Sequence, residues 1–336
     1  MKKSIFLLSL VAFCLQLFAE TTDYPSLPSN TRLRVVGANV MNYLSDFNAS
    51  NASCTTKAAF DAKTEKMATV FVGLKADVVA LNEVQEDDDI LDYLVVAMNN
   101  KIGSEVYDKV LDGSKYNNPA SGQYGNIKSG YIFRCDKLTE GVPESTNKND
   151  KTFRYRMQVI TFTENATHEK FVLSVNHFKA YDEGAAQRQE QATRLISALN
   201  SYSGDKDILI VGDLNEETDK PAVTKLINAG YAEQLVKYDS KAYSYTHYGQ
   251  RELIDHALAN SSMAKQITGA YVYHLTSAVN YSDHDCYVIG LNLGGTDIDE
   301  VTADATIPQR KLVYRDGQIL IQVEESFFDL MGRKIE

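Results

Sequence analysis

Six short segments of this chain place Asn, Asp, Glu or His directly after an apolar run. They are Gly37–Asn42, Ala80–Val84, Val175–Lys179, Gly212–Asn215, Leu253–His256 and Ser282–Asp285. Oxygen ligands without thiolates suit a hard cation such as Mg²⁺, Mn²⁺ or Ca²⁺, and histidines beside carboxylates suit proton transfer near neutral pH. Each segment alone is also typical of a turn, a cap or a solvated loop. Together they predict metal-assisted chemistry on a phosphate ester.

Two other classes of enzyme lack their signatures here. The sequence has no Gly-x-Ser-x-Gly elbow, which disfavours a Ser-His-Asp hydrolase. It also has no Walker loop, and the Gly294-Gly295 pair leads into a polar linker.

The composition is that of an acidic globular protein. The 336 residues include 34 Lys and Arg against 45 Asp and Glu, a formal net charge of −11, with 24% charged and 44% hydrophobic residues. This balance excludes a fibre, a low-complexity chain and a polytopic membrane protein. It disfavours a protein that holds nucleic acid by charge alone. A nucleic-acid enzyme stays open, because a bound divalent metal can supply positive charge locally.

The N-terminus predicts export. Met1–Lys3 precedes an apolar run, Ile5–Phe18, and Ala19 follows, which is the pattern of a secretory signal peptide over residues 1–19. The alternative is a membrane anchor, but the run is shorter than the roughly 20 residues that a bilayer span needs. We expect a secreted protein, located in the periplasm, at the cell surface or outside the cell, with no stable membrane insertion. Residues 20–31 are expected to form a linker.

Three cysteines lie beyond the signal peptide: Cys54, Cys135 and Cys286. They allow at most one internal disulfide, and the pattern assigns no pairing. Their spacing matches neither a zinc site nor a redox pair.

Apolar patterning predicts the elements that must position the polar segments. The expected strands are Arg32–Val40, Ala76–Leu81, Ser129–Phe133, Gln158–Phe162, Phe171–Val175, Ile208–Val211, Leu253–Leu258 and Tyr287–Leu293. The expected helices are Ala58–Leu74, Gln187–Leu199 and one that Pro221 opens and Gly230 closes. Because the polar segments fall at strand ends, the pattern favours a layered α/β sandwich with a site at one rim.

In this order the segments resemble the endonuclease/exonuclease/phosphatase superfamily, which has the fold of pancreatic deoxyribonuclease, and most closely its secreted bacterial extracellular nucleases. The motifs are Asn-His-Phe-Lys at 176–179, Gly-Asp-Leu-Asn at 212–215, Ile-Asp-His-Ala-Leu-Ala at 254–259 and Tyr-Ser-Asp-His-Asp at 281–285. The resemblance implies a catalytic domain over residues 32–293. Its implied fold is a four-layer sandwich of two packed mixed β-sheets flanked by helices.

The resemblance also assigns site residues by position. It implies catalytic roles for His177, Asp213, Asn215, Asp255, Asp283 and His284, metal ligation by Asn39, Glu83 and Asp283, and substrate binding by Asn39, Arg156, His177 and Asn215. Glu83 would be the principal carboxylate for a divalent metal, expected to be Mg²⁺, with Mn²⁺ and Ca²⁺ as alternatives. His284 would be the general base, and Asp255 would orient a histidine.

The remaining implied roles concern the phosphate. Asp213 and Asn215 would orient the attacking water and the scissile group, and His177 would donate a hydrogen bond to the phosphate or the leaving oxygen. Arg156 would contact a phosphate. Asn82 departs from the family pattern, because many members carry Gln or Met at that position.

The function expected from the resemblance is a secreted, metal-dependent nuclease that hydrolyses DNA, or RNA, by direct attack of water and leaves 5′-phosphate and 3′-hydroxyl ends. Sphingomyelinase-like and inositol-phosphate hydrolases share the same site chemistry and are the alternatives, and a catalytically silent binding module is disfavoured because every implied catalytic residue is present. The pairs Lys115-Tyr116 and Lys237-Tyr238 suggest base stacking. The oligomeric state stays open.

The C-terminus predicts a separate small unit. Residues 294–310 form a linker rich in Thr, Asp and Glu, and residues 311–336 form a β tail with a hairpin at Asp316-Gly317. The tail resembles the end of sorting domains used by type IX secretion, and an ordinary accessory hairpin is the alternative.

Overall fold

A computed structural model describes residues 24–87, 89–111, 127–145 and 158–294, together with the strand segments 310–315, 318–323, 326–328 and 334–335. The expected signal peptide and the position of Arg156 lie outside the described residues. The chain divides into two compact units, of which one ends at Gly294 and the other begins at Gly295.

The first sheet of the larger unit has six strands. They are β1 (Leu33–Tyr43), β2 (Val78–Gln85), β3 (Tyr107–Lys109), β4 (Ile127–Arg134), β14 (Ile267–Tyr273) and β15 (Cys286–Leu291). Their order is β14-β15-β1-β2-β4-β3. The β1 and β2 strands run parallel and the other neighbours run antiparallel, so the sheet is mixed.

The second sheet has seven strands. They are β5 (Leu138–Glu140), β6 (Glu144–Ser145), β7 (Gln158–Glu164), β8 (Lys170–His177), β9 (Ile208–Asp213), β10 (Ala232–Glu233) and β13 (Asp255–Ala259). Six follow the order β10-β13-β9-β8-β7-β5, and β6 pairs with β7. Here β8 and β9 are the parallel pair, so this sheet is mixed as well.

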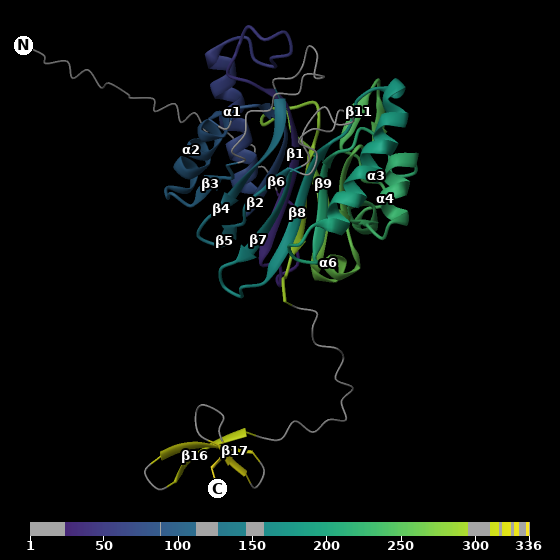
Figure 1. Cartoon of the computed structure of the whole chain (residues 1–336). Coiled ribbons are helices and arrows are strands. Elements are labelled where there is room, and N and C mark those ends of the chain that lie inside the picture. The colour runs from purple at the N-terminus through teal and green to yellow at the C-terminus, as the bar shows by residue number, and fades with distance from the viewer. Residues whose placement is uncertain are drawn as a thin grey trace, which may run out of the picture. The chain divides into compact units, whose positions relative to one another are not determined.

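Helices cover the outer faces of both sheets (Figure 1). The first sheet carries α1 (Lys57–Gly73) and α2 (Ile90–Ile102), and the second carries α3 (Ala185–Ser201) and α4 (Pro221–Asn228). Shorter elements are η2 (Asp182–Gly184), α5 (Gln234–Tyr238), β11 (Tyr245–His247), β12 (Gln250–Glu252) and α6 (Ser261–Gln266). The predicted α/β fold of two packed mixed sheets flanked by helices is therefore confirmed.

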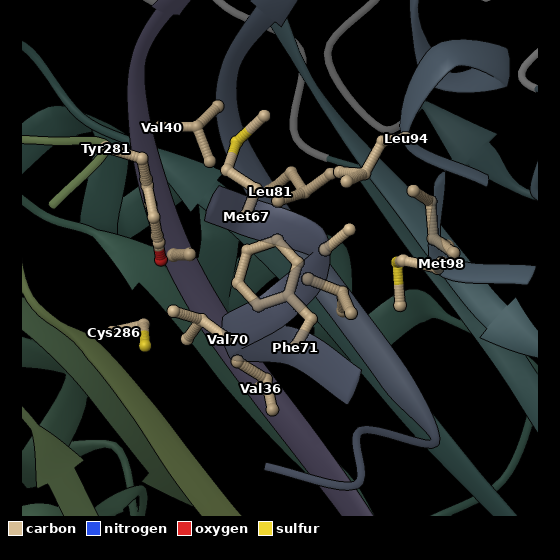
Figure 2. Packing of buried hydrophobic residues seen from close by; sticks show 14 of the residues in the cluster. Val36, Val40, Met67, Val70, Phe71, Leu81, Leu94, Met98, Tyr281 and Cys286 are labelled. Atoms are coloured by element: carbon tan, nitrogen blue, oxygen red, sulfur yellow. The ribbon is translucent and has the colours of Figure 1, made fainter. Parts of the chain in front are cut away.

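Alternation along the strands explains the layers. On β1, Leu33 and Val35 belong to the core between the two sheets, whereas Val36 and Val40 belong to the core beneath α1 and α2. Successive side chains on a strand point to opposite faces, so one strand fills two cores. Figure 2 shows Phe71 of α1 within the second of these cores, where its ring lies near Val36 and Val70.

Among the longer elements, α2 and β14 were not predicted from the sequence. Ile90, Leu91, Leu94 and Met98 form a buried face of α2, a helical spacing that the preceding acidic turn concealed. The other element is β14, whose strand residues pair with β15. In both cases the apolar pattern in the sequence is short or interrupted by polar residues, and burial against the first sheet decides the conformation.

The smaller unit contains an antiparallel sheet in the order β16-β17-β18-β19. Its strands are β16 (Arg310–Arg315), β17 (Gln318–Val323), β18 (Ser326–Phe328) and β19 (Lys334–Ile335). The first two form the hairpin predicted around Asp316-Gly317, residues that themselves lie outside the described ones. Across the described residues, no helix combines the length and apolar character needed to cross a membrane. Cys54, Cys135 and Cys286 are all free thiols.

Candidate active site

Strand register brings the polar segments to one rim. Asn39 on β1 lies opposite Asn82 on β2, and His177 on β8 lies opposite Asp213 on β9. Asp255 on β13 pairs with Asp213 from the other side. Both parallel pairs therefore end where the site begins, which is why residues far apart in the sequence converge there.

The amide of Asn39 holds two carboxylates together. Its Nδ2 donates to Glu83 Oε1 at 3.1 Å and to Asp213 Oδ2 at 2.9 Å. Its Oδ1 accepts from the Met41 N–H at 2.9 Å. In this geometry Asn39 acts as a bridge between the carboxylates, and its predicted role as a metal ligand stays a prediction.

A left-handed turn supports Glu83. Met41 and Asn42 both have φ of 48°, and Glu83 itself has φ of 63°, conformations that cost on the order of 1–3 kcal/mol each for residues other than glycine. The Asn42 N–H donates to Glu83 Oε2 at 2.9 Å. Lys63, which is buried, donates to the Met41 carbonyl and to Ser53 Oγ, both at 2.8 Å. The strain is thus held by specific bonds around the carboxylate.

Glu83, His177 and Asp213 form a group that could hold a cation. Their ligand atoms lie within 4.8 Å of one another, and His177 Nε2 is 3.8 Å from Glu83 Oε1 and 3.6 Å from Asp213 Oδ2. Burial raises the pKa of Glu83, and burial together with the charge of Asp255 raises the pKa of Asp213. A partly buried carboxylate, Glu83, and a buried one, Asp213, beside an imidazole fit a divalent metal, whose charge would offset the cost of their burial.

A histidine–aspartate pair stands next to this group. His284 Nδ1 lies 2.7 Å from Asp255 Oδ2, and His284 Nε2 lies 3.9 Å from Asp213 Oδ2. Burial alone lowers the pKa of His284, but the charge and hydrogen bond of Asp255, followed by the charges of Asp213 and Asp283, outweigh it and raise the pKa to about 10. The ring of Tyr245 packs against the imidazole with centroids 4.7 Å apart.

The remaining predicted residues occupy different places. Asn215, with φ of 51°, lines the same cavity and donates from Nδ2 to the Phe178 carbonyl at 3.2 Å. Asp283 is exposed. Among the described residues, two groups bring their ligand atoms within 4.8 Å of one another, and Asp283 belongs to neither. They are Glu83, His177 and Asp213, and Asp213, Asp255 and His284. Arg156 lies outside the described residues, so its role stays a prediction.

Several positioning residues were missed or undervalued in the sequence. Asn82 Oδ1 accepts the Asp213 N–H at 2.9 Å, so the residue that departs from the family pattern orients a site carboxylate. Ser282 Oγ donates to the Asn39 carbonyl at 2.8 Å. The Tyr287 hydroxyl accepts the Gly212 N–H at 2.7 Å and donates to the His256 carbonyl at 2.8 Å. For Asn82 and Tyr287, a polar group within an otherwise apolar strand was the signal in the sequence that could have identified them.

His256 serves the scaffold rather than the cavity. Its ring is fully buried and bonds Glu233 Oε2 at 2.8 Å and the Glu216 carbonyl at 2.7 Å. Burial lowers its pKa, but the hydrogen bond and charge of Glu233 outweigh burial and raise it. Both ring nitrogens are occupied, so this histidine fixes the strand that carries Asp255.

The site opens into a cavity of about 650 Å³. Its described lining combines carboxylates, imidazoles, cations and aromatic rings, including Glu83, His177, Lys179, Tyr181, Arg188, Asp213, Asn215, Tyr245, His247 and His284. A group that could hold a cation and a histidine–aspartate pair facing one cavity can bind an anionic ester and move a proton beside it.

Residues 48–284 match the profile of the Endonuclease/Exonuclease/phosphatase family. A comparison with curated protein sequences gave no match.

Solved structures share the fold. One is an endonuclease/exonuclease/phosphatase from Bacteroides vulgatus, with 14% identity, a TM-score of 0.58, and coverage of 78% of this chain and 98% of that chain. Another is a mannosyl-6-phosphatase from Bacteroides thetaiotaomicron, with 12% identity, a TM-score of 0.53 and coverage of 77% and 99%. A third is D. rerio TDP2 complexed with single strand DNA product, with 13% identity, a TM-score of 0.52 and coverage of 76% and 97%.

Proposed function

Because the chain belongs to the endonuclease/exonuclease/phosphatase family, a family of metal-dependent hydrolases of phosphate esters, we propose that it is a nuclease that hydrolyses phosphodiester bonds in DNA. The observation that carries the proposal is the convergence of Glu83, His177 and Asp213 with the His284–Asp255 pair on one cavity. Phosphodiester hydrolysis needs both charge neutralisation and proton transfer at one place.

The metal would be held chiefly by Glu83, with Asp213 alongside, and His177 would face the phosphate beside it. A divalent cation bound there would supply positive charge to neutralise the phosphate oxygens. We propose Mg²⁺, since the carboxylates offer hard oxygen ligands. The predicted contributions of Asn39 and Asp283 to metal binding belong to the same proposal.

The two histidines would divide the proton transfers. We assign His284 as the general base toward water and His177 as a donor to the phosphate or the leaving oxygen. Asp255 holds the His284 ring so that Nε2 faces Asp213. Without metal, the carboxylates around His284 raise its pKa to about 10, and positive charge held at those carboxylates would lower that pKa toward the range a base requires.

DNA is the proposed substrate for two reasons. The motifs around His177 and Asp255 are those through which the sequence resembles secreted nucleases. A solved structure with the same fold, that of D. rerio TDP2, holds a single strand DNA product. The acidic net charge of −11 means that binding would depend on the metal and on local cations such as Lys179 and Arg188.

Secretion is a second proposal, carried by residues 1–19. The full-length chain should be processed after Ala19, with the mature protein found outside the cytoplasm. N-terminal sequencing of the mature protein tests this: a mature N-terminus at Met1 would contradict it.

The first experiment is nicking of supercoiled plasmid DNA by the mature protein. We expect nicking with Mg²⁺ or Mn²⁺, and its loss with a chelator or in His284→Ala. His274→Ala is the matched control, because His274 also pairs with a carboxylate, Asp285 at 2.6 Å, but does not line the cavity.

The substrate panel decides between related functions. Oligoribonucleotides, sphingomyelin, inositol phosphates and mannose 6-phosphate are assayed beside DNA under the same conditions. Turnover of one of these in the absence of DNA cleavage would replace the nuclease proposal with that substrate. A folded, metal-loaded protein that hydrolyses none of them would contradict an enzymatic function.

A further inference from the structure

One residue that lines the cavity has an unusual backbone conformation. Tyr181, which precedes η2, has φ of 69° and ψ of 158°, a region that is essentially restricted to glycine. Its side chain is 69% exposed and lines the cavity. The strained backbone of Tyr181 is not compensated by burial of its ring. The conformation therefore points to a ligand-binding role for the exposed ring.

Buried contacts hold this conformation. Arg188 of α3, only 5% exposed, donates from Nη1 to the Lys179 carbonyl at 2.9 Å and to the Tyr181 carbonyl at 2.6 Å. Gln191 on the same helix accepts the Lys179 N–H at 2.9 Å. The loop that presents Tyr181 is therefore fixed from two positions on α3.

The same arginine, Arg188, connects this loop to the segment that contains Asp213 and Asn215. Arg188 Nε lies 3.7 Å from Glu216 Oε1, and Glu216 directly follows Asn215 in the sequence. The backbone of Tyr181 is thus tied through Arg188 to the residue that follows Asn215. A pre-set aromatic face needs little ordering when a ligand binds.

The chemistry around the ring indicates what it would bind. Lys179 Nζ lies 5.3 Å from the centroid of the Tyr181 ring, so a cation and an aromatic face are offered together. Flat bases stack on aromatic side chains while lysines contact the backbone phosphates of single strands. We propose that Tyr181 is the platform on which a nucleobase next to the scissile phosphate stacks, an inference that rests on the proposed nuclease function.

The predicted stacking pairs do not occupy this position. Lys237 Nζ does lie 5.2 Å from the Tyr238 ring, but the Tyr238 hydroxyl donates to the Ile267 carbonyl, and Tyr238 is not among the described residues that line the cavity. Lys115 and Tyr116 lie outside the described residues. Tyr181 was missed because its backbone conformation has no local sequence signal.

The test compares two single strands of equal length, one of thymidylates and one with abasic residues on the same phosphate backbone. Cleavage is measured with Mg²⁺ as kcat/KM, and binding is measured by fluorescence anisotropy in the His284→Ala background. We expect the wild-type protein to favour the base-bearing strand by about 5- to 100-fold, the range for stacking of one base.

Tyr181→Gly separates binding from folding. Glycine removes the ring and also relieves the strain, so the melting temperature should be maintained or raised while the preference for bases disappears. Activity on the abasic strand should stay within about twofold. Tyr181→Phe should retain the preference. Tyr248→Ala, which removes a 94% exposed ring that does not line the cavity, should also retain it.

The inference would be overturned by equal use of both strands by the wild type, or by an unchanged preference in Tyr181→Gly. Failure of the proposed function has a different signature, namely no hydrolysis of either strand by the wild type while a Tyr181-dependent preference in binding persists. A general fall in activity on both strands in Tyr181→Gly would indicate a structural role and would also overturn the stacking assignment.

Discussion

His284 is held between two carboxylates: its Nδ1 lies 2.7 Å from Asp255 Oδ2, and its Nε2 lies 3.9 Å from Asp213 Oδ2. The three residues come from two neighbouring strands and a separate loop, and 29 positions separate His284 from Asp255. Because Asp255 occupies Nδ1, the other ring nitrogen, Nε2, is the one that faces Asp213 and the cavity. This relationship makes the chemistry of the site testable residue by residue.

Replacing Asp255 with Asn should lower the pKa of His284 from about 10, because its partner's charge is the largest influence that raises it. We also expect kcat to fall by roughly 10²–10⁴-fold, since the imidazole loses its orientation. NMR titration of His284 in the metal-free protein measures the first effect. An unchanged pKa in Asp255→Asn would contradict the pairing.

Removing either cavity histidine should affect rate more than stability. For His177→Ala and His284→Ala we expect losses of roughly 10²–10⁴-fold in kcat, with cooperative unfolding preserved. Steady-state kinetics and thermal melting of each variant provide the measurements. His274→Ala controls for loss of a histidine–carboxylate pair outside the cavity. An equal loss of kcat in that variant would contradict a specific role for the two cavity histidines.

Glu83→Gln should weaken binding of Mg²⁺ by more than about tenfold. The metal-free variant should unfold no more easily than wild type, because burial already disfavours the Glu83 carboxylate and raises its pKa. Calorimetric titration and chemical denaturation test the two statements. Glu65→Gln is a control, since Glu65 pairs with Lys101 on the surface, and it should leave Mg²⁺ affinity unchanged.

The pH dependence of stability should carry the signature of His284. Its folded pKa of about 10 exceeds the ordinary value of 6.5, so its contribution is complete below about pH 6.5 and is lost as the pH rises through about 10. Lys63, whose pKa burial lowers to about 8, acts in the opposite direction above that pH. The free energy of unfolding of the metal-free protein should therefore fall more steeply from pH 6.5 to 8 than that of His284→Asn. Parallel pH profiles for the two proteins would exclude the raised pKa.

Gly212→Ala should destabilise the protein by about 3 kcal/mol or more, a size that follows only from a specific structural conflict. Gly212 has φ of 124°, and an added Cβ would lie 2.0 Å from the Asn176 carbonyl oxygen. Gly230→Ala is the matched control, because Gly230 also has positive φ, at 100°, but opens onto free space. It should cost about 1–2 kcal/mol. Equal free energies of unfolding for the two variants would contradict the close approach.

The sequence alone predicted the layered α/β fold and the segments that form the site. Strands and helices that bury one face show a regular spacing of apolar residues in the sequence, and polar residues that follow such a run are easily recognised. This is why β1, β8 and β9 and the polar segments at strand ends were predictable, whereas the roles of Glu83, Asp213 and His284 came from the resemblance and stay predictions. It did not predict α2, whose apolar face follows directly on an acidic turn and is stabilised by packing on the first sheet.

Only the tertiary structure decided which groups meet. Asp255 and His256 are adjacent in the sequence, yet Asp255 holds His284 while His256 bonds Glu233 within the scaffold. Strand register across the two sheets sets these pairings, and register depends on contacts between residues far apart in the chain. The positive φ of Glu83 is accompanied by hydrogen bonds from Asn39 and Asn42, far away in the sequence. That of Tyr181 is accompanied by a hydrogen bond from Arg188 on the following helix.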